Sequence, residues 1–209
     1  MARRRRPEAV ALALGLAPLA KLGVDGLAGR LGANPIAAGL DRLGFWTLTL
    51  LALSLAATPA HDLLGLRWPV RVRRTLGLLA FAYGTLHFAW YLGVDKFFDL
   101  REVVQDVARR RFVTVGFAAL LLLVPLALTS TDRAVRRMGF ARWKRLHRLA
   151  YGAALLGVVH FLWRVKADHR RPALFAVVVI ALLAARLPAA LTPRGDRGRP
   201  RPAAARRTG

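Results

Sequence analysis

The sequence predicts an all-α integral membrane protein, built as a bundle of about six transmembrane helices. Of its 209 residues 56% are hydrophobic, and the mean hydropathy is +0.37 although 22% of the residues are charged. The apolar residues gather into blocks that approach the roughly 20 residues needed to cross a bilayer, and arginines lie between the blocks. Six such blocks take about 120 residues. The remainder makes short loops and two basic tails, so we expect a single domain over residues 1–209.

Arginine clusters and prolines mark the ends of the predicted spans. Pro59 is expected to end the second span, because proline lacks the backbone N–H and the rotational freedom that a helix interior requires. Pro125 is expected to kink the last turn of the fourth span. The sixth span should stop before Pro188, and the arginine-, proline- and glycine-rich tail 188–209 is predicted to be disordered. The expected spans cover residues 10–20, 45–57, 75–92, 112–128, 146–163 and 173–187.

The first of these blocks is short for a membrane span and follows the basic run Arg3 to Arg6. A basic segment before a short apolar block is also the pattern of a secretory signal peptide. Two interpretations of residues 10–20 therefore stay open, a retained helix and a signal peptide.

The formal net charge of +23 would suggest nucleic acid as a partner if the protein were soluble. Here the positive residues flank apolar spans, which orients helices in a membrane and attracts anionic lipid headgroups. The sequence therefore predicts membrane lipid, and no nucleic acid, as a partner. Acidic residues dilute the charge of the loop after residue 92, so the positive-inside rule puts both termini in the cytoplasm.

The chain has no cysteine, which excludes disulfides, iron–sulfur clusters and the covalent attachment of c-type haem. Histidine is then the obvious strong ligand for a transition metal. Of the five histidines, His61 and His169 fall in predicted loops, and we assign them no role.

His87 and His160 lie within the predicted spans 75–92 and 146–163. An ionisable residue inside a span indicates function, although a hydrogen bond between packed helices is the alternative. His87 follows Arg74 by thirteen residues and His160 follows His147 by thirteen, and both helices run outward from basic pairs. At about 1.5 Å per residue the two side chains reach nearly equal depth. Two imidazoles at one depth can supply both axial ligands of a six-coordinate haem iron, a site that transfers electrons.

His147 lies at the cytoplasmic end of its span, level with Arg74 on the other helix. Arginine cannot ligate iron, so a second haem there would need a partner other than histidine. Arg73 or Arg74 can pair with haem propionates or a flavin phosphate. Contact of this basic cluster with lipid phosphates is the open alternative.

Several motifs in order along the chain are similar to those of the MsrQ (YedZ) family. They are Arg71 to His87 (RVRRTLGLLAFAYGTLH), Ala127 to Ser130 (ALTS), Met138-Gly139, Arg142 to Tyr151 (RWKRLHRLAY) and His160 to Lys166 (HFLWRVK), with Asn34-Pro35 and Thr58-Pro59 near the start. The resemblance covers a core of about residues 30–187. Arg111 departs from it, because the family pattern has a proline before Phe112.

The resemblance implies a ferric-reductase-like transmembrane domain in the bacterial inner membrane, acting as the haem-binding subunit of a methionine sulfoxide reductase system. Such a subunit carries haem b, one or two per chain, and FMN. It takes electrons from a flavin reductase or the quinone pool and passes them to a periplasmic molybdopterin subunit, MsrP, which repairs oxidised proteins. His87, His160 and His147 match the family histidines, and the sulfoxide chemistry belongs to the partner, so no catalytic residue is expected here.

Two other functions stay open from the residues alone. One is a stand-alone ferric or quinone reductase, which would work without a periplasmic partner. The other is a small transporter in which intramembrane histidines relay protons.

Overall fold

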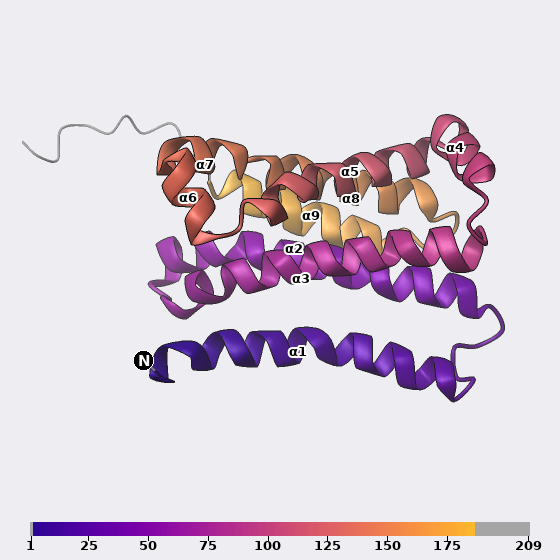
Figure 1. The fold of residues 1–209 in the computed structure, drawn as a ribbon, viewed down its shortest axis with the longest axis horizontal. Coiled ribbons are helices and arrows are strands. Elements are labelled where there is room, and N and C mark those ends of the chain that lie inside the picture. The colour runs from indigo at the N-terminus through magenta and orange to yellow at the C-terminus, as the bar shows by residue number, and fades with distance from the viewer. Residues whose placement is uncertain (1, 187–209) are drawn as a thin grey trace, which may run out of the picture.

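The computed structural model describes residues 2–186, and these contain helices and turns but no β-strand. Five helical stretches are long and apolar enough to cross a membrane, namely Arg6–Leu27, Pro35–Leu64, Trp68–Asp95, Arg111–Leu128 and Phe140–Arg164. Figure 1 shows the long helices side by side. The predicted all-α integral membrane fold is therefore confirmed. The sixth expected span corresponds to a helix of 15 residues, and the expectation for 188–209 lies outside the described residues.

The helices follow one another with short connections. They are α1 (Ala2–Leu27), α2 (Pro35–Leu64), α3 (Trp68–Trp90) with its π-helical extension η1 (Tyr91–Asp95), α4 (Leu100–Arg109), α5 (Arg111–Leu128), α6 (Asp132–Met138), α7 (Phe140–Leu146), α8 (Leu149–Arg164) and α9 (Arg170–Ala184).

Two helix pairs make up the centre of the bundle. The most extensive contacts are those of α2 with α3 and of α5 with α8, while α9 packs on α8 and α2. Their shared core includes the fully buried Leu55, Ala80 and Ala154. Helix α4 lies at one end of the bundle and α6 and α7 lie at the other (Figure 1). We call these the α4 end and the α6–α7 end.

Helix α1 is longer than the predicted span 10–20 and lies along α3 (Figure 1). The hydroxyl of the buried Tyr83 on α3 donates a hydrogen bond of 2.7 Å to the Gly15 carbonyl. A Cβ atom at Gly15 would lie 2.5 Å from Cδ1 of Leu79, so a larger residue there would require the Leu79 side chain to move. Helices α1 and α3 therefore pack closely at this point and are joined by a hydrogen bond.

The expected end of α2 at Pro59 is wrong, because the helix continues to Leu64. Proline cannot donate to the carbonyl four residues earlier, which here belongs to Leu55. A side-chain nitrogen of Arg186 donates to that carbonyl instead. Neighbouring helices commonly replace a lost bond in this way inside membranes. The helix ends at Gly65, whose φ of +68° forms a left-handed cap.

Two further boundaries differ from expectation. Helix α3 begins at Trp68, before Arg71, Arg73 and Arg74, so these arginines lie on its first turns and do not precede it. Pro69 is compatible with this start, because backbone N–H groups in the first turn of a helix have no carbonyl partner within the helix, so the N–H that proline lacks is not needed. His61, expected in a loop, lies in the last turn of α2 with an exposed side chain.

Candidate functional site

His87 and His160 come together near the α4 end of the bundle. His87 lies in the last turn of α3 and His160 lies on α8. Their ring centres are 6.1 Å apart and their ring planes are nearly perpendicular, at 89°. The sequence predicts that His87 and His160 lie at equal depth, and the structure shows that their rings also face each other at close range.

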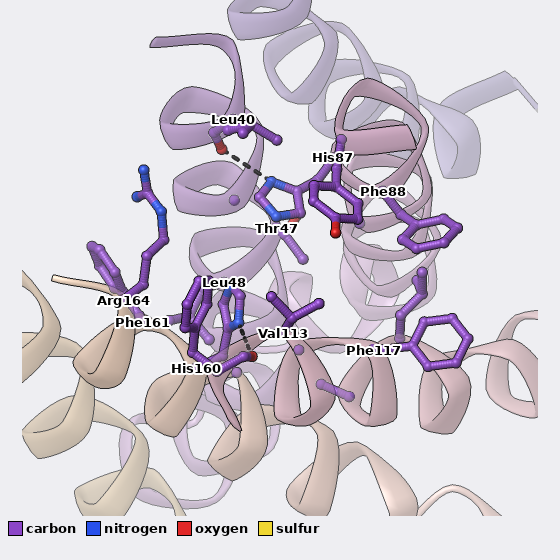
Figure 2. Close-up of a pocket in the computed structure, with 18 of the residues that line it drawn as sticks. Leu40, Thr47, Leu48, His87, Phe88, Val113, Phe117, His160, Phe161 and Arg164 are labelled. Atoms are coloured by element: carbon purple, nitrogen blue, oxygen red, sulfur yellow. Dashed lines mark hydrogen bonds between the residues drawn. The ribbon is translucent and has the colours of Figure 1, made fainter. Parts of the chain in front are cut away.

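Each ring is fixed by a backbone carbonyl from a different helix. Nδ1 of His87 lies 3.0 Å from the Leu40 carbonyl oxygen of α2, and Nδ1 of His160 lies 2.7 Å from that of Phe112 on α5. A carbonyl only accepts, so both Nδ1 atoms must carry the proton and donate. Nε2 of each neutral ring then keeps its lone pair, and Figure 2 shows this nitrogen on the side of the ring that faces the other histidine.

A glycine lies one helical turn after each of these carbonyls. A Cβ atom at Gly116 would lie 2.5 Å from Nδ1 of His160, and one at Gly44 would lie 3.3 Å from Nδ1 of His87. Any larger residue at Gly116 would push the ring away from the Phe112 carbonyl. Glycine thus lets the two rings lie against helix backbones.

The histidines line a cavity of about 280 Å³ between α2, α3, α5 and α8 (Figure 2). Interiors of proteins are close-packed, so a space of this size between helices suits a ligand. Its walls are mostly apolar, and its charged residues come from the ends of helices and their connections. The apolar walls include Leu48, Leu51, Val113, Phe117, Leu120 and Leu123, and the charged residues are Asp41, Asp95, Arg110 and Arg164.

The spacing of the two rings fits a metal between them. An imidazole nitrogen lies about 2.0 Å from the metal that it binds and roughly 1.1 Å from its own ring centre, so two facing rings on one metal have centres about 6.2 Å apart. The observed separation is 6.1 Å. Two facing imidazoles, apolar walls and a charged rim match the needs of a haem, which is a flat apolar macrocycle with two carboxylates.

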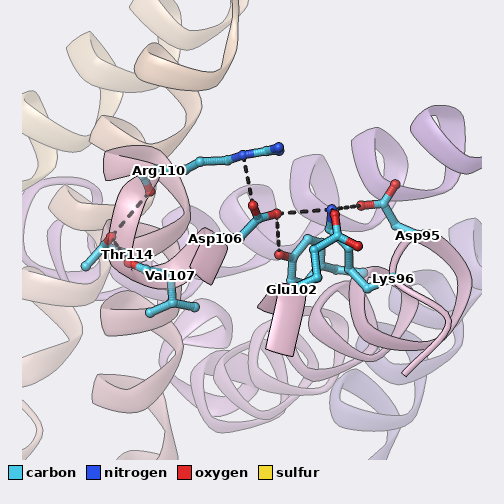
Figure 3. A network of polar contacts seen from close by, with 8 residues as sticks. Asp95, Lys96, Glu102, Asp106, Val107, Arg110 and Thr114 are labelled. Atoms are coloured by element: carbon cyan, nitrogen blue, oxygen red, sulfur yellow. Dashed lines mark hydrogen bonds and ion pairs between the residues drawn. The ribbon is translucent and has the colours of Figure 1, made fainter. Parts of the chain in front are cut away.

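Beside this cavity a network of charges joins η1, α4 and the start of α5 (Figure 3). Asp106 is buried and accepts from the hydroxyl of Tyr91 at 2.9 Å, from Lys96 at 3.1 Å and from Arg110 at 2.9 Å. Burial alone would raise the pKa of Asp106, but the bonds from Tyr91 and Lys96 outweigh it and hold this pKa below its usual range. The carboxylate of Glu102 raises the pKa of Lys96, against the effect of burial. The network holds Arg110 at the rim of the cavity.

His147 lies apart from the other two histidines. The Thr129 hydroxyl donates to the Pro125 carbonyl at 2.6 Å, and its oxygen lies 3.1 Å from Nε2 of His147. The ring stacks on Trp143, with centres 4.0 Å apart. In this arrangement Nε2 of His147 faces a hydroxyl and no second histidine.

The remaining candidates lie at different places. Arg73 is half-buried and donates to the Thr58 hydroxyl at 3.1 Å, whereas Arg74 is exposed and pairs with Asp132 at 2.9 Å. The exposed His169 precedes α9 as its cap residue. His61 and His169 are thus solvated, as expected, and neither lines the cavity.

Comparison with known proteins matches residues 43–158, more than half of the chain, to the family described as "Ferric reductase like transmembrane component". The "Protein-methionine-sulfoxide reductase heme-binding subunit MsrQ" of Rhodospirillum rubrum is 52% identical over 172 residues, which cover 82% of this chain and 83% of that protein. The MsrQ of Deinococcus radiodurans is 52% identical over 174 residues, covering 83% and 85%. That of Caulobacter vibrioides is 50% identical over 167 residues, covering 80% of both.

The chain belongs to the MsrQ family. Membership confirms the resemblance based on the histidine motifs. Most residues that line the cavity, His87 among them, lie within the matched segment, whereas His160 lies two residues beyond its end. A multi-pass membrane protein follows from the family and the apolar helices together.

Several residues of this site were not predicted from the sequence. They are Leu40 and Phe112, whose carbonyls accept from the histidines, the glycines Gly44 and Gly116, and the rim arginines Arg110 and Arg164. The glycines did leave a signal, since glycine inside a helix is unfavourable and often marks a close approach. The arginines left none that separates them from the other loop charges.

Proposed function

We propose that this MsrQ family member is a haem b electron-transfer subunit of the bacterial inner membrane. The observation that carries the proposal is the facing pair His87 and His160, with both Nε2 atoms available at a separation that fits one iron. When bound, a haem held by two imidazoles exchanges an electron without changing its ligands. The names of the relatives describe them as haem-binding subunits, which supports the same assignment.

The protein's residues would hold this group in three ways. The Leu40 and Phe112 carbonyls fix the tautomer and direction of the two rings. The apolar walls exclude water from the macrocycle. Arg110 and Arg164 lie at the charged rim, where they can pair with propionates, although each already has a carboxylate partner, Asp106 and Asp41 respectively.

The electron route is proposed from the family. Electrons would come from a flavin reductase or the quinone pool and pass to a periplasmic MsrP-like molybdopterin subunit in a heterodimer, where methionine sulfoxide is reduced. FMN is proposed as a further cofactor on the same ground. His147 is kept as a proposed ligand of a second haem, for which its Nε2 would have to exchange Thr129 for iron.

The orientation rests on charge. The α6–α7 end carries Arg133, Arg136 and Arg137 on α6 and a further basic group on α7, whereas the α4 end mixes cations with acids. We therefore place the α6–α7 end in the cytoplasm, which puts both termini there. The contact of Tyr83 with Gly15 supports α1 as a retained helix of one domain over residues 1–209, with the core at 30–187.

The test is the absorbance of the purified full chain in mild detergent, oxidised and dithionite-reduced, with a pyridine haemochrome assay. We expect a six-coordinate b-type spectrum that is lost in His87→Ala and in His160→Ala. The matched control is His61→Ala, an exposed histidine that should leave the spectrum unchanged. A His147→Ala variant that lowers the haem-to-protein ratio from two to one would assign the second haem. If both cavity variants kept the wild-type reduced spectrum, the assignment of the axial ligands would be wrong.

A colourless protein that takes up no added haemin would favour the proton-relay transporter. Reduction of iron chelates by the isolated chain, with an electron donor but no periplasmic subunit, would favour the stand-alone reductase.

A further inference from the structure

The connection between the spans Trp68–Asp95 and Arg111–Leu128 exposes a cluster of large apolar side chains. We call this cluster the α4 apolar patch; its members are Phe97, Phe98, Leu100 and Val104, and they are between 65% and 78% exposed. Single apolar residues on a surface need no explanation, but a cluster of them marks a surface that something covers.

Helix α4 has three different sides, because successive residues are rotated by about 100° around its axis. The first side, with the buried Val103 and Asp106, packs on the bundle next to α5. The second side carries Leu100 and Val104 of the patch, about 40° apart on the helix. The third side is polar and exposed, with Arg101, Glu102, Gln105 and Arg109. A helix with an exposed apolar side and an exposed charged side suits the plane of a membrane interface.

The place of α4 in the chain puts it at the level of that interface. The span before it ends at Asp95 and the span after it begins at Arg111, so the connection lies where the chain leaves and re-enters the bilayer. Helix α4 has ten residues and is therefore about 15 Å long. It lies beside the start of α5 at one end of the bundle (Figure 1).

Phe97 and Phe98 join the patch to the surface of the preceding span. The tip of the Phe98 ring lies over Gly93 of η1, where an added Cβ atom would be 3.1 Å from Cζ of the ring. Both aromatic residues have a positive φ, +47° for Phe97 and +62° for Phe98. This left-handed conformation is unfavourable for bulky side chains and persists only where the surroundings enforce it. Here it keeps two aromatic rings on the exposed surface.

We propose that the α4 apolar patch inserts into the lipid interface and anchors α4 in the membrane surface. The occupant is lipid because the patch continues onto a membrane span at Gly93. Exposed arginines on the adjoining side of α4, Arg101 and Arg109, suit anionic headgroups. Arg110 at the rim of the histidine cavity follows α4 directly, so the anchor would also steady this rim. The proposal goes beyond electron transfer and does not depend on a bound haem.

The experiment exploits a chain without cysteine, in which one introduced thiol takes one spin label. The variants are Phe97→Cys and Val104→Cys in the patch, with Gln105→Cys as the matched control, since it is the next residue and is also exposed. The full chain is placed in nanodiscs of phosphatidylethanolamine and phosphatidylglycerol. Electron paramagnetic resonance then compares collisions of each label with oxygen, which enters lipid, and with a water-soluble nickel chelate.

We expect the labels at positions 97 and 104 to lie roughly 5–10 Å below the level of the lipid phosphates. The label at position 105 should lie at or above that level, in contact with the nickel chelate. The proposal is overturned if the labels at 97 and 104 meet the chelate as freely as the label at 105, which would leave the patch free for a protein partner. It is equally overturned if they are shielded from both reagents, because protein then covers them.

A second measurement avoids the label. Val104→Asp puts a charge on the apolar side of α4, and Gln105→Asp puts the same charge on the polar side. In nanodiscs we expect the backbone amides of residues 97–109 to lose their protection from hydrogen exchange in Val104→Asp and to keep it in Gln105→Asp. Equal exchange in the two variants would contradict the anchor. Circular dichroism checks that each variant is folded, so the result is independent of the haem assignment.

Discussion

At the scale of single residues, the histidine pair repeats one arrangement twice. Each Nδ1 donates to a helix carbonyl, and each carbonyl is followed four residues later by a glycine: Leu40 by Gly44, and Phe112 by Gly116. The absence of a Cβ lets the ring approach the backbone closely enough to form the bond. The orientation of both rings therefore depends on the two glycines.

Gly116→Ala tests this dependence. The new Cβ would lie 2.5 Å from Nδ1 and 2.8 Å from Cε1 of His160, so the ring must move and its bond to Phe112 must break. We expect about 10–100-fold weaker haem affinity, the usual effect of losing a partner that orients a metal ligand. Haemin titration of the apo-protein measures this. Gly44→Ala, with contacts of 3.2–3.3 Å, should have a smaller effect.

The matched control is Gly152→Ala on α8. Its Cβ would meet only the end of the flexible Leu122 side chain, at 3.3 Å. The haem affinity should stay unchanged, since alanine also suits a helix better than glycine. Equal affinities in the Gly116 and Gly152 variants would show that the close approach does not position His160.

At the scale of helices, α2 shows how a proline can be accommodated within a membrane span. Pro59 leaves the Leu55 carbonyl without its helix donor, and Arg186 supplies a replacement from beyond the end of α9. A bond between residues so far apart in the sequence ties the C-terminal helix to α2. This tertiary contact therefore supports the continuation of α2 past Pro59, and the helix ends at the Gly65 cap.

A double-mutant cycle between Pro59→Ala and Arg186→Met measures this link. Arg186→Met alone leaves the carbonyl unpaired and should lower the free energy of unfolding by about 1–3 kcal/mol. In the Pro59→Ala background the cost should fall by about 1 kcal/mol, because the backbone N–H gained by that substitution can take over. Unfolding in mixed detergent gives all four values. Effects that add within about 0.3–0.5 kcal/mol would disprove the coupling.

At the scale of the whole molecule, charge is arranged differently at the two ends. At the α4 end, cations are paired with acids around the buried Asp106 (Figure 3). At the other end, Arg73 and Arg186 have no acid among the described residues. Protonation of carboxylates is therefore expected to break buried ion pairs at the first end, whereas the other end has the exposed pair of Arg74 with Asp132.

This difference predicts a pH dependence of stability. The pKa of Asp106 is lower in the folded protein than its ordinary value of 3.8, so its contribution is complete above that value. It is lost as the pH falls through the folded pKa. The pKa of Lys96 is raised above its ordinary 10.5, so its contribution is complete below that value and is lost only at higher pH. Between these limits the network is fully charged.

The thermal unfolding midpoint of the detergent-solubilised protein should therefore fall as the pH drops below about 4. Asp106→Asn should have a lower midpoint at neutral pH and a flatter acid slope, because it has no carboxylate there to protonate. Asp62→Asn, at an exposed position without an ion pair, should keep the wild-type slope. An acid slope that is the same in all three proteins would show that Asp106 does not control this transition.

The sequence by itself determined the fold class and the depth of His87 and His160. A chain of this composition can cross the hydrocarbon of a bilayer only as long apolar helices. Composition and block length were therefore enough to predict the fold class. The fixed rise per residue was enough for the second, since His87 follows Arg74 by thirteen residues and His160 follows His147 by thirteen.

Only the tertiary structure decided which groups surround those two histidines. The Leu40 and Phe112 carbonyls, the rim position of Arg110 and the bond from Arg186 to Leu55 all join different helices. Periodicity along one helix fixes how deep a side chain lies, but lateral neighbours depend on which helices pack together and how each is rotated. That information arises from packing among all the helices, and no single segment carries it.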